Sequence, residues 1–357
     1  MHFAPGTDYS KLDVACPDCG AALRYGGGKK EMVCGDCGYK QSLSIDSGEI
    51  NPHALVAGVK LDRYPKWDHS SFSAWQCGAC KVRYFTATSG QPVACPSCGA
   101  ESQAADPEPP ACILPAGILP ALISEKVAHK RLNRHIGRKP LLIDAVRALR
   151  KSPGLRLVYA PIWTLDAWVR ATWRAEVGFE YETEVNGKKE KKTLFEYLKG
   201  YLETFCDRMP VNGSKLVPEL KEVWDYPWDQ ALPMQAVYLA QGFVEGAATG
   251  SDGVLKEGEK LVDKQLEIAA GNKVPGASYK DLVISADKRL LALRIFLVPV
   301  WVTSYVWAGK TYRMVVNGAT GKVFGQKILD PKRVVVAVAA GVGLAVLAAA
   351  VAVWVKG

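Results

Sequence analysis

Histidine is scarce in this chain, and the histidines that occur are badly placed for chemistry. None of the five stands at metal-ligand spacing or beside a convincing nucleophile partner; they are His2, His53, His69, His129 and His135. The Gly-rich stretch 316–325 lacks the lysine and hydroxyl ending of a phosphate-binding loop, so we expect a hairpin turn there. Because the sequence contains no catalytic constellation, it predicts a protein that is not an enzyme.

One aromatic and acidic cluster, "EVWDYPWDQALP" at residues 222–233, offers a weaker enzymatic alternative. Trp224, Asp225, Trp228 and Asp229 could line the pocket of a membrane-bound enzyme. Clusters of this kind more often pack two elements together, with each aspartate at the start of a helix or turn. We therefore interpret these four side chains as packing residues.

Long apolar runs are absent from most of the chain, and the exception lies at its C-terminal end. Residues 334–355 contain no charge and no proline over 22 residues. As a helix this run is about 33 Å long, which is enough to cross a hydrocarbon core of about 30 Å. The sequence therefore predicts a C-terminal transmembrane anchor.

The charges that flank the apolar run predict its orientation. Lys332 and Arg333 stand before it and only Lys356 follows, so the positive-inside bias keeps the N-terminal domains in the cytoplasm. The prediction is a single-pass, tail-anchored protein of the cytoplasmic (inner) membrane. Small residues in the run, Ala339, Gly341, Gly343 and Ala345, would also allow two such helices to approach closely in a homo-oligomer.

Eight of the ten cysteines form two copies of one pattern. Cys16, Cys19, Cys34 and Cys37 make two Cys-x-x-Cys pairs, and the same spacing returns 61 residues later in Cys77, Cys80, Cys95 and Cys98. Four thiolates on tight turns close a tetrahedral zinc site and leave no position for water. We expect two structural Zn²⁺ ions, one per set. Disulfides are the alternative, but no cleavable signal peptide precedes the cysteines, and we expect a reducing compartment.

The positive charge of the chain is concentrated in one segment. Between Lys126 and Arg156 there are ten Lys or Arg residues and one acid, whereas residues 1–110 contain ten bases and twelve acids. The spacing predicts a helix that Pro140 ends, followed by a second short helix, with Ala128, Leu132 and Ile136 facing inward. Four basic residues form a stripe on another face: Lys126, Lys130, Arg134 and Arg138. This stripe is either a contact with anionic lipids or an acidic partner, or a solvated surface.

Composition divides the chain into five parts, ending in the membrane anchor. They are a first zinc ribbon (1–50), a second zinc ribbon (51–100), a Pro- and Ala-rich linker (101–123), an α+β domain (124–330, with the basic helical segment 126–156) and the transmembrane anchor (331–357). The α+β domain is expected to contain duplicated antiparallel β-hairpins, because residues from Leu155 and from Leu293 align with Pro161 on Pro299 and Trp163 on Trp301. Residues 192–209 and 234–271 are expected to be mostly helical.

Several stretches together resemble a known family. The two ribbons, "ILPALISEKVAHKRL" (118–132), "VYAPIWTLDA" (158–167), "VPVWVTSYVWAGKTYRMVVNGATGKVFG" (298–325) and the apolar tail are similar to bacterial membrane-anchored proteins with zinc ribbons of the transcription-factor-IIB type. Members of that family are similar to partners of phage-shock-protein-A-type and flotillin-like membrane proteins. The resemblance implies an adaptor at the cytoplasmic membrane face.

These observations lead to one functional hypothesis and one alternative. The hypothesis is a non-enzymatic, tail-anchored adaptor that recruits protein partners in membrane remodelling or envelope stress through its ribbons and α+β domain. The alternative is a nucleic-acid-binding zinc-ribbon protein tethered to the membrane, in which the basic segment meets phosphate. The acidic balance of the ribbon module disfavours nucleic acid as the ribbons' own ligand.

Overall fold

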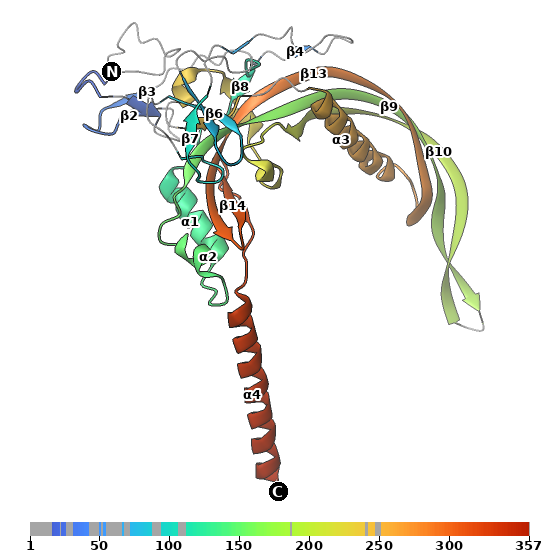
Figure 1. Cartoon of the computed structure of the whole chain (residues 1–357). Coiled ribbons are helices and arrows are strands. Elements are labelled where there is room, and N and C mark those ends of the chain that lie inside the picture. The colour runs from blue at the N-terminus through green and yellow to red at the C-terminus, as the bar shows by residue number, and fades with distance from the viewer. Residues whose placement is uncertain are drawn as a thin grey trace.

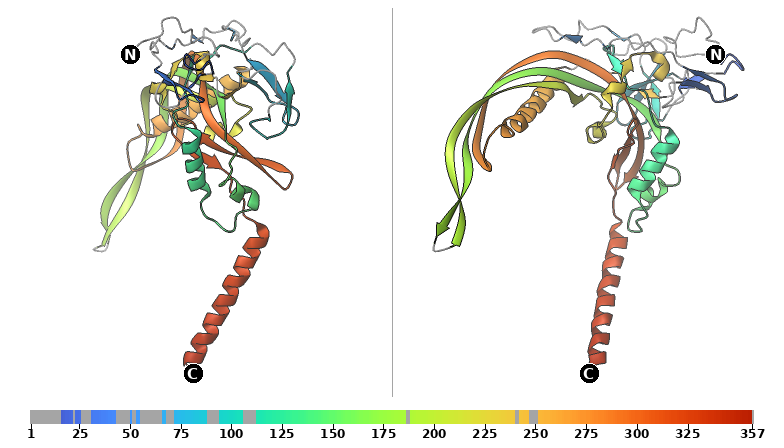
Figure 2. Two further views of the ribbon diagram at one scale, coloured as in Figure 1. Left: turned by 90° about the vertical axis from the view of Figure 1, so that its left-hand side faces the viewer. Right: turned by 180° about the vertical axis from the view of Figure 1, so that it is seen from behind.

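The chain folds into a compact body, a long curved arm and a protruding C-terminal helix (Figure 1). This computed structural model describes residues 16–21, 23–25, 31–42, 50, 53–54, 66–67, 72–87, 94–105, 112–185, 188–239, 242–246 and 251–356. The described parts of the two ribbons lie on the body, away from the free end of the arm and from the C-terminal helix (Figures 1 and 2).

The arm is a sheet of three very long antiparallel strands in the order β10-β9-β13. They are β9 (Arg156–Val185), β10 (Lys188–Asn212) and β13 (Ser278–Trp307). Helix α3 (Ser251–Gly271) lies under the arch, on its concave face (Figure 1). Beyond the body, where β9 alternates from Ala167 onwards, the strands are therefore buried on one side only, and the other side of the arm is open.

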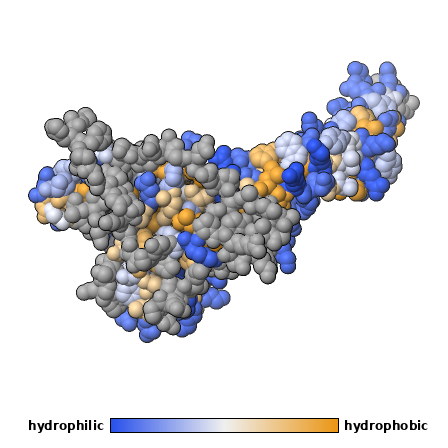
Figure 3. Space-filling model, turned by 90° about the horizontal axis from the view of Figure 1, so that it is seen from above, coloured by the Kyte–Doolittle hydropathy of each residue, from blue (hydrophilic) through white to orange (hydrophobic). Residues whose placement is uncertain are grey.

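Period-two alternation explains why β9 can be so long. Ala167, Val169 and Ala171 point to the concave side and are buried with Val262 and Leu266 of α3. The alternate positions form the convex face, which carries charged residues and four exposed aromatic side chains: Trp168, Tyr197, Tyr201 and Phe205. Seen from above, the arm is mostly hydrophilic towards its free end, with hydrophobic side chains interspersed (Figure 3).

A buried carboxylate joins the three strands where the arm leaves the body. Both neighbours of β9 bulge at this level, β10 between Cys206 and Met209 and β13 between Leu290 and Ala292. Asp166 of β9 lies between the bulges. Its Oδ1 accepts a hydrogen bond from the Arg208 backbone N–H at 3.0 Å, and its Oδ2 forms an ion pair with the Arg294 guanidinium. Asp166 thus fixes the geometry of the arm's root.

Replacing Asp166 by alanine should destabilise the folded chain by about 3–5 kcal/mol, because it leaves the half-buried charge of Arg294 without its partner. Urea unfolding of the detergent-solubilised chain would measure this. Asp207→Ala is the matched control, since Asp207 makes a solvent-exposed ion pair with Arg208 and should change stability by less than about 1 kcal/mol. Equal effects of the two substitutions would show that Asp166 does not hold the root of the arm.

Short strands complete the body around the inner half of β13. Its edge opposite β9 pairs with β14 (Lys310–Asn317), then with β8 (Gly117–Ile118) and then with β4 (His53–Ala54). The remaining body strands are β11 (Leu232–Pro233), β12 (Phe243–Val244), β15 (Val323–Gly325), and β5 (Ser73–Cys77), β6 (Arg83–Thr86) and β7 (Ser102–Ala104) of the second ribbon. Strands β1 (Leu23–Tyr25), β2 (Glu31–Cys34) and β3 (Lys40–Ser42) of the first ribbon form a separate sheet. The described part of the body also contains short 3₁₀ helices, η2 (Pro218–Glu222), η3 (Trp228–Gln230) and η4 (Ala236–Leu239).

The expectation of duplicated hairpins is not confirmed. Residues from Leu293 do form a hairpin, β13–β14, whose turn at Ala308 and Gly309 has positive φ at both positions, as a tight hairpin turn requires. Residues 156–185, however, form one uninterrupted strand. The two aligned segments pair with each other, with Tyr159 opposite Pro299, so the domain is mostly β with antiparallel sheets.

The helix expected over residues 192–209 is wrong, because these residues belong to strand β10. Leu194, Leu198, Leu202 and Cys206 recur every four residues, which favours a helix. Positions four apart also lie on the same face of a strand, since four is a multiple of two. In the second helical expectation, 234–271, the α-helix begins only at Ser251, and residues 236–239 form a 3₁₀ helix.

The stretch 101–123, where composition predicts a linker, contributes to the body. Its described residues include β7, which pairs with β5, and β8, which pairs with β13. Ile113, Ile118 and Leu119 are buried. Its two described prolines, Pro115 and Pro120, therefore lie between short packed pieces of chain.

The basic segment folds as two short helices beneath the body, α1 (Glu125–Ile136) and α2 (Asp144–Ala148). Ala128, Leu132 and Ile136 are buried, as their spacing predicts. The helix ends at Gly137, whose φ is +68°, and therefore before Pro140. The cluster beneath α1 includes Met314 and Val316 of β14.

Helix α4 (Pro331–Lys356) extends from the body into open space (Figure 2). Its window Pro331–Ala348 has a mean hydropathy of 1.7 and none of it is buried, which makes α4 the one candidate membrane span among the described residues. An apolar helix that packs against nothing in its own chain suggests association with a membrane.

Candidate metal centres and the membrane-proximal surface

The four Cys-x-x-Cys turns share one backbone conformation. In each turn the first cysteine N–H donates to a carbonyl five residues later, and an N–H four residues later donates back to the first cysteine carbonyl. The residue after the second cysteine has positive φ, which suits glycine at positions 20, 38 and 99. Lys81 occupies the fourth such position, with φ of +59°.

The sulfur atoms of each set are already arranged as the corners of a metal site. All four Sγ atoms in a set lie within 4.8 Å of one another. The Sγ–Sγ distance is 3.5 Å for Cys16–Cys37, Cys19–Cys34 and Cys77–Cys98, and 3.7 Å for Cys80–Cys95. A tetrahedron with Zn–S bonds of about 2.3 Å has edges of about 3.8 Å. Both sets fit a Zn²⁺ ion.

The backbone around one ligand also favours its ionised form. Hydrogen bonds from the N–H groups of Cys37 and Asp36 lower the pKa of the Cys34 thiol to about 7. A thiol must lose its proton to bind zinc, so Cys34 is ready to do so near neutral pH.

The second cluster is built into the main sheet. Its strand β6 pairs with β12, which in turn pairs with β9. Two arginines of the body hold the Cys95–Cys98 turn: Arg156 Nη1 donates to the Cys95 carbonyl at 2.6 Å, and Arg313 Nε donates to Ser97 Oγ at 2.8 Å. The turn that carries two of the zinc ligands is thereby tied to Arg156, the first residue of β9, which we call the base of the arm.

The first cluster is more exposed. Cys19 and Cys37 are open to solvent, whereas Cys16 and Cys34 are buried with Val237 and Leu239 of η4. In the second cluster, Cys80 and Cys98 are half-buried and Cys77 and Cys95 are buried. The outer turns of the first ribbon are therefore available for contact with another molecule.

The predicted basic stripe lies on α1 and the loop after it, in the part of the body from which α4 leaves. Lys126, Lys130 and Arg134 are exposed along α1, and Arg138 is exposed in the loop that follows the helix. None of the four makes an ion pair with another described residue. All four side chains are therefore accessible to solvent, and their contact with lipid or an acidic partner stays a prediction.

Arg333, in the first turn of α4, ties that helix to the basic segment. Its guanidinium Nη2 lies 2.8 Å and 2.9 Å from the two carboxylate oxygens of Asp144, and its Nη1 donates to the Leu142 carbonyl at 2.6 Å. The Asp330 N–H donates to the Leu141 carbonyl at 2.7 Å. Because of these bonds, α2 lies beside the start of α4, whereas α1 lies further from it, next to β14 (Figure 1).

The Trp/Asp cluster at residues 222–233 packs as expected. Trp228 contacts Phe296 at 5.2 Å between ring centres, and the Tyr226 hydroxyl donates to the Pro299 carbonyl at 3.1 Å. Asp225 and Asp229 are exposed. Cys112 and Cys206, outside the two sets, are buried and form no disulfide with a described residue.

Sequence reasoning missed a buried glutamate in the body. Burial raises the pKa of Glu245 to about 7, although the carboxylate accepts hydrogen bonds from the Ser214 hydroxyl and from the N–H groups of Lys215 and Leu216. These bonds close the loop after β10 onto β12. No local pattern marks Glu245, because its partners lie about thirty residues away.

Comparison with known proteins gives no relative. No family model, curated protein or solved structure matches the chain.

Proposed function

We propose that this protein is a non-enzymatic adaptor, anchored in a membrane by α4, which recruits protein partners through its first zinc ribbon. The observation that best supports this proposal is the difference in solvent exposure between the two cysteine clusters. The second is bound into the sheet by Arg156 and Arg313, whereas the first exposes Cys19 and Cys37 and the turns around them. Such a division gives one ribbon a structural role and leaves the other free to bind.

Membrane anchoring is supported by the exposure of α4. The helix is apolar on all sides, and its first 18 residues have no contact that buries them. In water such a surface is unfavourable, whereas in lipid the helix satisfies its own backbone hydrogen bonds. Lys332 and Arg333 before the span support a cytoplasmic position for the body and a location in the inner membrane.

The partner class follows from the family resemblance. The similarity to membrane-anchored zinc-ribbon proteins implies phage-shock-protein-A-type or flotillin-like partners, and a role in membrane remodelling or envelope stress. Affinity purification from detergent-solubilised membranes tests this proposal. The wild-type chain should retain specific proteins that a Cys34→Ser chain loses, since serine cannot complete the first cluster. Identical protein sets from the two chains would refute recruitment by the first ribbon.

The basic stripe supports a second contact, with anionic lipid headgroups. The bonds from Arg333 hold α2 of the basic segment at the start of the anchor, and each basic residue near an anionic surface contributes about 1 kcal/mol. An acidic protein surface is the other candidate for this stripe. If nucleic acid bound here instead, the purified complex would be sensitive to nuclease and would dissociate steeply with salt.

Reversing the charge of the stripe should distinguish a contact with anionic lipid from a solvated surface. Changing Lys126, Lys130, Arg134 and Arg138 to glutamate should weaken binding of the chain lacking 334–357 to anionic vesicles by at least 100-fold, because attraction becomes repulsion. Sedimentation with vesicles of anionic and neutral lipid measures the loss. The control reverses four exposed lysines of the arm, α3 and the loop after α3: Lys199, Lys256, Lys264 and Lys273. Equal losses of vesicle binding in both variants would show that the stripe is an ordinary solvated surface.

A further inference from the structure

The outer half of β13 has an unpaired edge. The inner part of the same edge carries β14 at Val300–Trp307, β8 at Phe296–Leu297 and β4 at Ala292–Leu293. From Ser278 to Leu291 no described strand pairs with it, although β9 occupies the opposite edge. Backbone N–H and C=O groups on such an edge can pair with a further strand.

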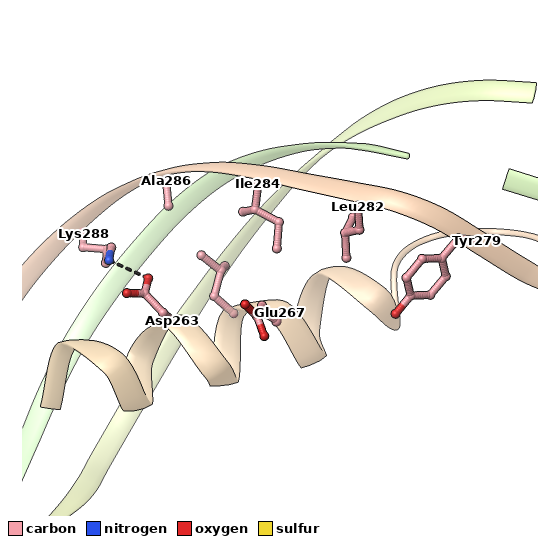
Figure 4. Close-up of a pocket in the computed structure, with 8 residues that line it drawn as sticks. Asp263, Glu267, Tyr279, Leu282, Ile284, Ala286 and Lys288 are labelled. Carbon is pink, nitrogen blue, oxygen red and sulfur yellow. Dashed lines mark hydrogen bonds and ion pairs between the residues drawn. The ribbon is translucent and has the colours of Figure 1, made fainter. Parts of the chain in front are cut away.

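A groove runs along this open edge, on the concave side of the arm. It has a volume of about 700 Å³ and lies between α3 and β13. Figure 4 shows Leu282, Ile284 and Ala286 pointing from the strand towards the helix. These side chains are only half-buried, because α3 lies mainly beneath β9 and β10. A strand added beside β13 would place its alternate side chains over this groove.

The helix side of the groove is acidic. Asp263 and Glu267 of α3 both face it (Figure 4). Asp263 is paired with Lys288 at 2.5 Å, whereas Glu267 makes no ion pair with any described residue. A basic side chain of the occupant would pair with Glu267, and it would stand two residues from an apolar one, since only alternate side chains of a strand face α3.

We propose that the open edge of β13 binds an extended segment of a partner protein, which adds as a strand to the arm. The segment has apolar residues at alternate positions facing α3 and a lysine or arginine that reaches Glu267. Three strands already use the same edge nearer the body, and the groove supplies the pocket for side chains. This binding site is separate from the first zinc ribbon.

A second copy of the chain fits this edge less well. Two antiparallel copies of β13 would be related by a two-fold axis perpendicular to the sheet. The outer half of the arm curves downwards, so that its sheet is inclined to the body and to α4 (Figures 1 and 2). Rotation about such an inclined axis would point the two α4 helices in different directions, which one membrane does not allow.

Selection from a random ten-residue peptide library displayed on phage, against the full chain in detergent, tests the proposal. The selected peptides should alternate apolar and polar residues and contain a lysine or arginine. Amide hydrogen exchange in residues 278–291 should slow at least tenfold when such a peptide is bound, because backbone pairing protects these groups. Selected peptides without alternation, no selected peptides, or unchanged exchange would each overturn the proposal.

Two variants and one control locate the site. Glu267→Lys should weaken binding of the selected peptide at least tenfold by charge repulsion, and Ala286→Trp should weaken it by filling the groove. Glu259→Lys, an exposed residue of the same helix that does not line the groove, should leave the affinity unchanged. Glu267 and Glu259 are exposed and Ala286 is half-buried, and zinc content reports that each variant has folded. Equal affinity of Glu267→Lys and Glu259→Lys would contradict the assigned site, and so would crosslinking of the edge to a second copy of the chain.

Discussion

Replacing Cys95 by serine should release one zinc ion and unfold the base of the arm. Cys95 is fully buried, and its carbonyl accepts the hydrogen bond from Arg156 at the start of β9. Structural zinc contributes about 10–16 kcal/mol to the folding of small zinc domains, so a cluster with three cysteines loses much of that energy. Strands β5, β6 and β7 belong to the same sheet as β9, and the loss is expected to spread into the arm.

Limited proteolysis combined with amide hydrogen exchange would measure this effect. In the Cys95→Ser chain, protection should fall in residues 73–104 and in the first ten residues of β9. The matched control is Cys34→Ser, the equivalent position of the first cluster. That chain should also lose one ion, but the loss of protection should stay within residues 16–42, because β1, β2 and β3 form their own sheet. Equal spread of disorder in the two variants would contradict the different roles of the clusters.

Deleting residues 334–357 should change the protein from an integral membrane protein into one that alkaline carbonate extracts. Each apolar residue of α4 is more stable in lipid than in water, and no other described helix is long and apolar enough to cross a bilayer. The rest of the fold should persist, because α4 buries none of its span against the body. Arg333 and its bonds to Asp144 and Leu142 remain in the shortened chain.

Flotation of cell membranes in a density gradient, before and after a carbonate wash, distinguishes the outcomes. The full chain should float after the wash, and the shortened chain should stay at the bottom. A shortened chain that floats before the wash and is released by salt would indicate binding through the basic stripe. A full chain that carbonate extracts would contradict the anchor.

The metal clusters and the apolar helix could be predicted from the sequence because each is a local pattern. Cys-x-x-Cys places two thiolates on one turn, and the two spacings agree over all eight ligands. The buried face of α1 was likewise predictable, because Ala128, Leu132 and Ile136 recur at a helical spacing within one element. In each case the residues that determine the structure stand close together in the chain.

The complete arm could not be predicted, because only β9 and β10 are neighbours in the chain and β13 joins them from far away. Strand β9 contacts β13 over more than a hundred residues of sequence, as in the ion pair between Asp166 and Arg294. In β10, the leucines recur every four residues, and this spacing is equally compatible with one face of a helix and one face of a strand. The half-exposed Ile284 and the acidic Glu267 form one groove only after α3 has folded back beneath the sheet. The expected hairpin repeat failed for the same reason, since the matched segments are partners in one sheet.

The roles assigned to the ribbons depend on one metal ion bound at each cluster. The most direct measurement is the zinc content of the purified full chain, determined by elemental analysis after exchange into metal-free buffer without chelator. The account predicts two equivalents per chain, falling to one in Cys34→Ser and in Cys95→Ser. A full chain that holds one equivalent or none, or a single substitution that removes both ions, would contradict two independent structural zinc sites.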